Sequence, residues 1–347
     1  MKKLKALSLF VLLALCSVVS AHDFMITLDG QNVYFNILNK SKKTVEITYN
    51  GSIVNNLSTY YEGEFKVPAK VKYEGTVYTV VAVGPKAFAG ADKLTAIELP
   101  MGVDNIGDFA FEGCTSLSKI IFPGNVVKFG QGVFFKCDKI QNVSFGSEWK
   151  EVDLKMFRWS DSLTIVNIPA KMERILNSKS VKNLEIFAAD VNNSYFTTID
   201  GILYSADNET LLSCPRAYRS RVVVAEGTKN IAKGAFVNCN DVVSVDLPES
   251  MESMSFRTFF RMSSLDELII RNPNPIATAK ISGEEVFLLQ VSNPDLVLKV
   301  AKSAKKAYKE AMNLKTGEYT DLDEDIPYLV ELNNMPNVEN LVTVKKF

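Results

Sequence analysis

Histidine is almost missing from this sequence of 347 residues, in which His22 is the only one. Its scarcity removes most Ser-His-Asp, Cys-His and histidine–metal chemistry, because those sites need an imidazole as base or ligand. The five cysteines include no Cys-x-x-Cys pair, which argues against zinc and iron–sulfur sites. We therefore predict a protein that is not an enzyme and that holds no metal and no cofactor.

An excess of charge of either sign is also lacking. The chain has 39 basic and 40 acidic residues, with a net charge of −1 at pH 7, and its basic residues form no arm or cluster. Nucleic-acid binding is not expected, because it needs a concentrated basic surface. The apolar share of 47% is large enough to form an extended core, which excludes disorder as the main state.

Only the amino terminus carries a long apolar run. Lys2, Lys3 and Lys5 precede the run from Ala6 to Val19, which is shorter than the ~20 residues that span a bilayer. Small side chains precede a cleavage point after Ala21, as in a secretory signal peptide. We predict export to the periplasm, cell surface or medium, with no stable membrane span. Lipidation at Cys16 is not expected, because Leu15 stands where lipoprotein signals have a small residue.

A repeat of about 23 residues organises most of the chain. It is set by four apolar columns, of which the first is phenylalanine and the others follow six, nine and eleven residues later. The phenylalanines are Phe88, Phe111, Phe134, Phe157, Phe236 and Phe259. The last two columns, such as Ile97 with Leu99, are two residues apart and so share one face of a short strand. A period of this length predicts a solenoid.

Two more strands continue the pattern without the phenylalanine, and they pair Leu184 with Ile186 and Val222 with Val224. Eight coils result, with strand-to-strand steps of 23, 23, 23, 18, 38, 23 and 23 residues. The long step contains an insertion at 192–214, where Asp200-Gly201 predicts a hairpin turn. The rest of each coil is expected to be the turn that returns the chain to the next strand.

Two segments make a family resemblance specific. Ile106 to Leu117 and Ile231 to Cys239 resemble the BspA-type leucine-rich repeat of exported bacterial proteins, as do the prolines that close the strands at Pro100, Pro123, Pro169 and Pro248. The insertion from Tyr195 to Pro215 is similar to an element found between repeats of that family. The resemblance implies a leucine-rich-repeat solenoid, and family members are associated with surface attachment.

The predicted fold is α/β in class and mostly β, a solenoid of about eight coils of short parallel strands. We divide the chain into a signal peptide at 1–21, a β-rich amino-terminal cap at 22–82, the solenoid at 83–271 and a mixed carboxyl-terminal cap at 272–347. The first cap is expected to contain hairpins around Asp29-Gly30 and Glu74-Gly75, and the second a helix at 301–314. The caps would cover the open edges of the sheet.

Three cysteines, Cys114, Cys137 and Cys239, occupy one repeat column three residues after the phenylalanine. An exported protein could pair Cys114 with Cys137, but the column also holds Ala91, Ser160 and Met262. We therefore favour a small inward-facing position with free thiols. Cys214 lies in the insertion and has no partner in the repeat.

Strand residues that alternate with the buried columns form outward-facing ladders. Their residue types vary from coil to coil while the buried columns stay apolar, which is compatible with a binding face and equally with unconstrained solvated residues. The candidate ligand-binding residues are Asn142, Ser144, Asn167, Glu185, Arg221 and Asp246. Trp149 and Trp159 are further candidates, with packing under the adjoining turns as the alternative.

These observations favour a non-enzymatic exported module that binds or adheres to an extracellular protein or glycan. One alternative is a glycan hydrolase that depends on a pair of carboxylates, since the sequence has 40 acidic residues. The other is a structural protein of the cell envelope without a specific ligand.

Signal cleavage can be tested directly. Protein recovered from the envelope or medium of the producing cell is expected to begin at His22, because the small residues before it suit the signal peptidase. Intact-mass measurement decides the outcome. A mass that still includes residues 1–21, or a lipid mass on Cys16, would contradict the prediction.

Overall fold

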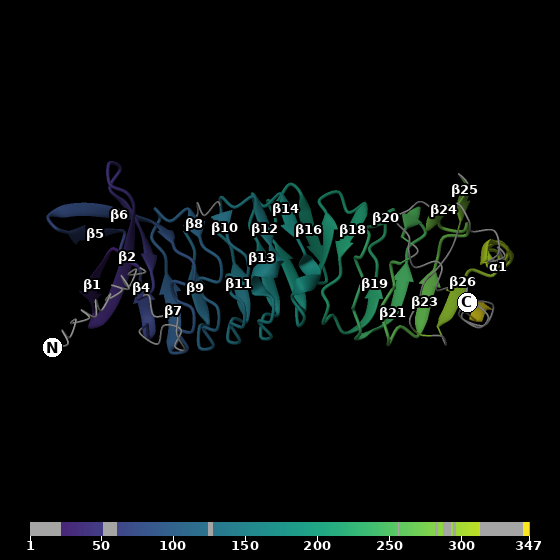
Figure 1. Ribbon diagram of the computed structural model, residues 1–347. Helices are drawn as coiled ribbons and strands as arrows, with labels where there is room; N and C mark the ends of the chain where they lie inside the picture. Colours follow the sequence, from purple (N-terminus) through teal and green to yellow (C-terminus); the bar gives the residue numbers. More distant parts are fainter. Residues whose placement is uncertain are drawn as a thin grey trace, which may run out of the picture.

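The computed structural model describes residues 22–50, 61–123, 128–255, 257–281, 284–286, 293, 296–312 and 343–346. The chain forms an elongated β-solenoid of about eight coils, with β1 (Phe24–Leu28) at one end and α1 (Lys305–Met312) near the other (Figure 1). Helix is scarce in the described part, where the only α-helix has eight residues, so the fold is the predicted solenoid with almost no α component.

The predicted short parallel strands line one side of the solenoid (Figure 1). The register aligns Val143 with Val166 and Val245 with Leu268, which confirms the inward column nine residues after the phenylalanine. We call this set the first row. It comprises β4 (Gly63–Lys66), β7 (Leu94–Glu98), β9 (Lys119–Ile121), β11 (Asn142–Ser144), β13 (Ile165–Ile168), β15 (Ile186–Ala189), β19 (Ser220–Val223), β21 (Val242–Leu247), β23 (Glu267–Ile270), β26 (Val297–Val300) and β27 (Thr343–Lys346).

One strand assignment from the sequence is wrong. β15 pairs with β13 so that Phe187 lies beside Val166, and Ile186 is exposed. Leu184 is buried three residues before Phe187, as Leu163 is before Val166, so it belongs to the column that follows the phenylalanine by six residues. The aromatic side chain takes the inward strand position, because it has the most apolar area to bury. The step from Val166 is therefore 21 residues and not 18.

A second row of strands runs along the opposite side of the coils, where the sequence predicted only returning turns. Its members are β8 (Asn105–Ile106), β10 (Lys128–Phe129), β12 (Glu151–Asp153), β14 (Arg174–Leu176), β20 (Asn230–Ile231) and β22 (Ser253–Met254). The 3₁₀ turns η1 (Leu154–Phe157) and η2 (Ser178–Ser180) follow β12 and β14. Each strand has only two or three residues and places one apolar side chain inward, such as Ile106 or Val152, which is too short a pattern for alternation to show.

Both hairpins expected before the repeats are present. β1 (Phe24–Leu28) pairs antiparallel with β2 (Gln31–Asn39), and β5 (Lys70–Tyr73) with β6 (Thr76–Val83). Asp29-Gly30 and Glu74-Gly75 have positive φ, as two-residue turns of this kind require. β3 (Thr44–Thr48) joins β2 to β6, and β6 continues into the second row through β8.

The first row extends beyond both predicted edges of the solenoid. β4 lies before residue 83 and pairs with β7, while β26 lies after Arg271 and pairs with β23. β24 (Ala279–Ile281) and β25 (Glu284–Val286) form a small hairpin near the carboxyl end. The division into caps and repeats stays a prediction.

The carboxyl-terminal helix begins four residues later than the predicted 301–314. It is α1 (Lys305–Met312), because the chain needs a turn after β26 before the helix begins. Residues 313 and 314 lie outside the described part of the chain. Ala304 and Tyr308 are buried, and the Tyr308 hydroxyl donates to the backbone oxygen of Asn274 at 2.7 Å.

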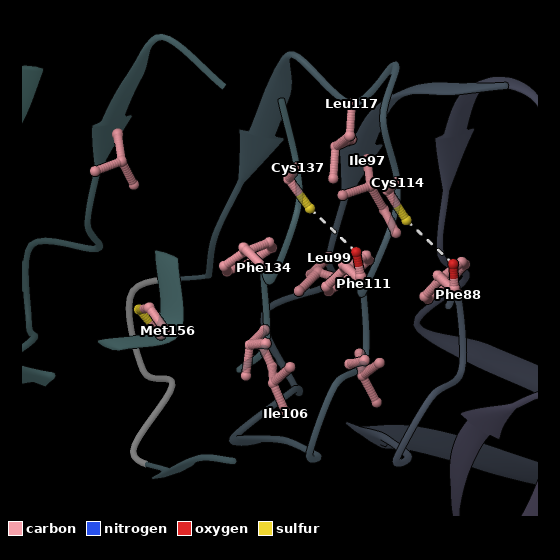
Figure 2. Packing of buried hydrophobic residues seen from close by; sticks show 14 of the residues in the cluster. Phe88, Ile97, Leu99, Ile106, Phe111, Cys114, Leu117, Phe134, Cys137 and Met156 are labelled. Carbon is pink, nitrogen blue, oxygen red and sulfur yellow. Dashed lines mark hydrogen bonds between the residues drawn. The ribbon is translucent and has the colours of Figure 1, made fainter. Parts of the chain in front are cut away.

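Stacked phenylalanines form the centre of the coils (Figure 2). The rings of Phe88, Phe111, Phe134 and Phe157 follow one another at centroid distances of 5.0, 5.2 and 5.2 Å and within 12° of parallel. Beside them, the thiols of Cys114 and Cys137 each lie 3.1 Å from the backbone oxygen of the phenylalanine in the preceding coil. At Cys114 and Cys137 the small inward column therefore also supplies hydrogen bonds to the backbone of the preceding coil.

Each coil turns at a residue with left-handed backbone two positions after the phenylalanine. The residues there are Gly90, Gly113, Lys136, Trp159, Asn238 and Arg261, with φ between 58° and 72°. Only two are glycine, so the turn is held mainly by the surrounding backbone. Gly90, for example, donates to the backbone oxygen of Glu112 in the next coil at 2.7 Å.

The insertion forms a small sheet that separates two parts of the core. β16 (Phe196–Ile199), β17 (Ile202–Ser205) and β18 (Thr210–Ser213) are antiparallel, and β18 continues into the second row by pairing with β20. On β17, Leu203 packs into the amino-terminal cluster, whereas Ile202 and Tyr204 pack into the carboxyl-terminal cluster. The hairpin predicted at Asp200-Gly201 is therefore present as β16 and β17, in a sheet that lies between the two core clusters.

The leucine column provides a test of this core. We expect Leu117→Ala to lower the free energy of unfolding by about 2–5 kcal/mol, because Leu117 is fully buried between coils. Lys119→Ala, at an exposed position of β9 two residues later, is the matched control and should change it by less than ~0.5 kcal/mol. Denaturant melts measure both. Equal changes in the free energy of unfolding for the two variants would mean that Leu117 contributes no more to coil stacking than an exposed residue does.

Candidate functional site

The outward face of the first row is the candidate site, since it holds the residues singled out in the sequence. Alternate residues of each strand point to opposite faces, so the buried columns leave a second set of side chains outside. This set mixes exposed apolar residues, such as Ile121 and Val223, with polar ones. The structure collects the polar residues into two separate groups.

The first group, which we call the amide cluster, is Asn142, Ser144 and Asn167. Ser144 lies beside Asn167 in the register of β11 and β13. The Asn167 side-chain nitrogen donates to the Val143 backbone oxygen and to the Ser144 hydroxyl, both at 3.1 Å. Asn142 and Ser144 are exposed. The cluster therefore presents an amide in a fixed orientation beside groups that are open to solvent.

Glu185 does not join these residues. The register places Ala188 beside Asn167, so the ladder position assigned to Glu185 is wrong. Glu185 lies just before β15, where its backbone nitrogen donates to the Thr164 oxygen at 2.9 Å. Because this coil places Phe187 inward in place of the predicted residues, Ala188 takes the outward position that had been assigned to Glu185.

The second group, which we call the arginine cluster, is Arg221, Asp246 and Arg271. The Asp246 side chain is only 1% exposed, although it projects from the outward face of β21. Arg271 donates to its two oxygens at 2.8 and 2.7 Å, and Arg221 also binds it. The arginine side chains themselves stay 48% and 53% exposed.

The electrostatics of Asp246 follow from this geometry. Burial alone would raise the pKa of the carboxyl, but the hydrogen bonds from Arg271 and Arg221 outweigh it and lower the pKa below its usual value. The carboxylate stays ionised at neutral pH and fixes both guanidinium groups. Each guanidinium keeps donors free for a ligand, because Asp246 has only two oxygens and five donors exist on every arginine.

Arg271 and Lys299 were not singled out from the sequence, although both bind residues of the outward face. Ser244 lies 3.4 Å from Glu267 through their side-chain oxygens, and Lys299 forms an ion pair with Glu267. Arg271 follows β23 directly and reaches back to Asp246 over 25 residues. Its position at a strand end, outside every ladder, gave no signal in the sequence.

The two tryptophans have different environments. Trp149 is buried among Phe122, Phe129 and Phe145, and its indole nitrogen donates to the Pro123 oxygen at 3.3 Å, so it packs under the turns. Trp159 is 56% exposed at a left-handed turn position. A groove of about 830 Å³ runs over Trp149 on the side of the second row, with Asp108, Lys128 and Glu148 among the lining residues.

Two negative observations concern the described residues alone. They contain no group of three or more His, Cys, Asp or Glu side chains arranged to hold a metal ion. None of their helices is long and apolar enough to cross a bilayer.

Comparison with protein families identifies the repeats. The family described as "BspA type Leucine rich repeat region" matches residues 76–200 and 217–321 in six copies. These two ranges together make up more than half of the chain. A comparison with curated proteins finds no match.

Solved structures share the fold. The crystal structure of the pneumococcal vaccine antigen PcpA is similar with a TM-score of 0.52 and 15% identity, covering 94% of this chain and 100% of that one. A leucine-rich repeat protein from Eubacterium ventriosum has a TM-score of 0.51 and 17% identity, covering 80% of this chain and 78% of that one. At these identities the likeness establishes the fold.

The arginine cluster predicts a pH-dependent contribution to stability. We expect Asp246→Asn to lower the free energy of unfolding by about 1–3 kcal/mol at pH 7, because it removes hydrogen bonds between charged groups. A carboxyl whose pKa is lowered by folding stabilises above its unfolded pKa of about 4, and that contribution disappears as the pH falls through the lower folded value. The difference between Asp246→Asn and the parent protein should therefore shrink in acid.

Denaturant melts at pH 7 and pH 3 measure this difference. Asp241→Asn, at an exposed position just before β21, is the control and should have little effect at either pH. An equal loss for Asp246→Asn at both pH values would contradict the assignment.

Proposed function

The chain belongs to the BspA-type leucine-rich repeat family, and on this basis we propose that it is a non-enzymatic binding or adhesion module that acts outside the cytoplasm. The proposed binding surface is the outward face of the first row, with the amide cluster and the arginine cluster as its polar contacts. The partner is an extracellular protein or glycan. Glu185 is not part of the proposed surface.

The observation that carries this proposal is the fixed orientation of Arg221 and Arg271 by Asp246. Stacking of the coils needs only the apolar columns, so it does not explain a buried carboxylate on the outer face. Removing an ionised group from water is costly unless partners compensate for it. Because Asp246 already holds the side chains of Arg221 and Arg271, they lose little further conformational entropy when they bind a partner, which favours affinity.

The chemistry of the two clusters suits a polar ligand. Guanidinium groups bind carboxylates in paired hydrogen bonds, and amides bind hydroxyl and peptide groups. Exposed apolar residues such as Val223, which lies beside Asp246 in the register of β19 and β21, can contact the apolar parts of a protein or sugar. A solenoid spreads such contacts along an extended surface instead of a deep cleft.

Export is part of the proposal. The apolar run at 6–19 and the small residues before His22 support it, and it would place the strand face where extracellular partners are found. Residues 1–21 lie outside the described part of the chain.

Glycan and extracellular-protein arrays test the function. The full-length protein is expected to bind saturably, and Arg221→Ala should weaken binding about tenfold, since it removes a charged hydrogen-bond donor. Arg174→Ala is the matched control, because Arg174 is an exposed arginine on β14 in the second row and forms an ion pair with Glu151. Its binding should stay unchanged.

The alternatives give different results in the same assay. Turnover of a bound glycan that is lost on replacing one acidic residue would favour a carboxylate-dependent hydrolase. Absence of saturable binding at ~100 μM would favour a structural protein of the envelope. Equal losses for Arg221→Ala and Arg174→Ala would place the binding surface elsewhere.

A further inference from the structure

The turn from a first-row strand to the next second-row strand closes on one repeated residue. The backbone nitrogen of that residue donates to the oxygen three residues earlier, at 3.0 to 3.4 Å, and its side chain is buried. The residues at this position are Val103, Trp149, Met172 and Met251. Three coils close the turn with valine or methionine, so stacking of the coils does not require a tryptophan here.

Strand pairing differs at the tryptophan. After Val103, Met172 and Met251, the strand that follows pairs with its predecessor in the second row, β8 with β6, β14 with β12 and β22 with β20. After Trp149, β12 begins a separate sheet, and among the described strands β10 ends the sheet before it. The Trp149 ring packs against Phe129 of β10, with ring centroids 4.6 Å apart. The largest side chain of the column thus stands where the second row is interrupted.

The groove of about 830 Å³ lies along this interruption. Its lining includes Lys128 and Phe129 from β10 and residues 151–153 of β12. The volume is within the range of about 300–1,000 Å³ that is usual for ligand sites. At Gly130, another lining residue, a Cβ atom would lie 2.3 Å from the Asp108 nitrogen, so the coils stay in close contact at that edge. The opening is therefore local and not a general separation of the coils.

Charged side chains at the rim of the groove are held by the next coil. Three ion pairs connect Glu148 with Lys171, Lys150 with Glu173 and Glu151 with Arg174, at 2.6, 2.8 and 2.9 Å. A charged ligand would have to compete with these pairs. Hydroxyl groups can donate to the carboxylates and accept from the ammonium groups while the pairs stay formed. The rim therefore suits a neutral ligand that is rich in hydroxyl groups.

The groove also offers an apolar surface. Phe129 is half-buried, and Trp149 beside it is fixed by the hydrogen bond from its indole nitrogen to the Pro123 oxygen. A sugar ring has apolar C–H faces and a rim of hydroxyl groups, which match an aromatic surface bordered by polar side chains. A peptide cannot enter as an added strand, because Phe134 and Phe157 of the two coils stack 5.2 Å apart, about one strand spacing.

We propose that this groove is a binding site for a neutral oligosaccharide. One sugar ring lies against Phe129, the Lys128 ammonium donates to a sugar oxygen, and the Glu148 carboxylate accepts from a hydroxyl group. The site is on the side of the second row, so it does not depend on the binding surface proposed for the first row.

Fluorescence of Trp149 tests the site. Trp159→Phe leaves Trp149 as the only tryptophan of the full chain, so its emission reports on the groove. This protein is titrated with linear hexasaccharides of glucose, mannose and xylose, each up to about 1 mM. We expect a saturable change with at least one of them. No saturable change with any of the three, or saturation only by the charged peptides hexaglutamate or hexalysine, would overturn the proposal.

Lys128→Ala in the same background should weaken sugar binding about tenfold, because it removes a charged hydrogen-bond donor. Lys139→Ala is the matched control, since Lys139 is also an exposed lysine but lies in a turn outside the groove lining. Its affinity should equal that of the parent. Equal affinities for Lys128→Ala and Lys139→Ala would contradict the proposed contact.

Trp149→Met provides a second variant, which is expected to fold because methionine closes the same turn at Met172 and Met251. Denaturant melts verify its cooperative unfolding, and calorimetry measures its binding of the same sugar. We expect binding to be lost, because methionine at this turn lets neighbouring strands pair. Unchanged affinity in this variant would place the sugar site elsewhere. The Lys128→Ala result does not depend on how this variant folds.

Discussion

Stacking of one coil on the next is the interaction on which the rest of this structure depends. A single coil has an apolar edge that it cannot bury alone, and the parallel rings from Phe88 to Phe157 show how neighbours bury it together. The same spacing aligns the backbone ladders of both strand rows and the turns between them. Side chains on the outer face are thereby brought into register without contributing to the core.

The sequence predicted what this stacking requires and little else. The phenylalanine, leucine and strand columns were visible because every coil must repeat them, and the hairpins at Asp29 and Asp200 were visible because their turns need special backbone angles. The second row of strands was not visible in the sequence, because strands of two or three residues show no alternation to detect. The coil at Phe187 was misplaced by the choice between adjacent apolar residues, Ile186 and Phe187, which only packing decides.

The candidate surface was predictable in outline but not in its contacts. Alternation along a strand identifies which residues face outward, so Asn167 and Arg221 could be named from the repeat. That Asp246 would be buried between two arginines depends on Arg271, which lies outside the repeat columns. Likewise, Lys179 and Cys214 come from irregular segments. That the Cys239 sulfur lies 3.5 Å from the Lys179 nitrogen and 3.6 Å from the Cys214 oxygen follows from how the insertion folds back. Long-range contacts of irregular segments have no periodic signature.

The internal sheet at β16–β18 limits how far unfolding spreads along the solenoid. In a stack of repeats, the loss of one coil exposes the apolar edge of the next, so fraying proceeds from neighbour to neighbour. Here a hydrogen-bonded partition closes both halves of the interior, with Leu203 and Leu212 facing one half and Ile202 and Leu211 the other. When coils on one side of this sheet come apart, the hydrophobic cluster on the other side therefore stays covered by the sheet.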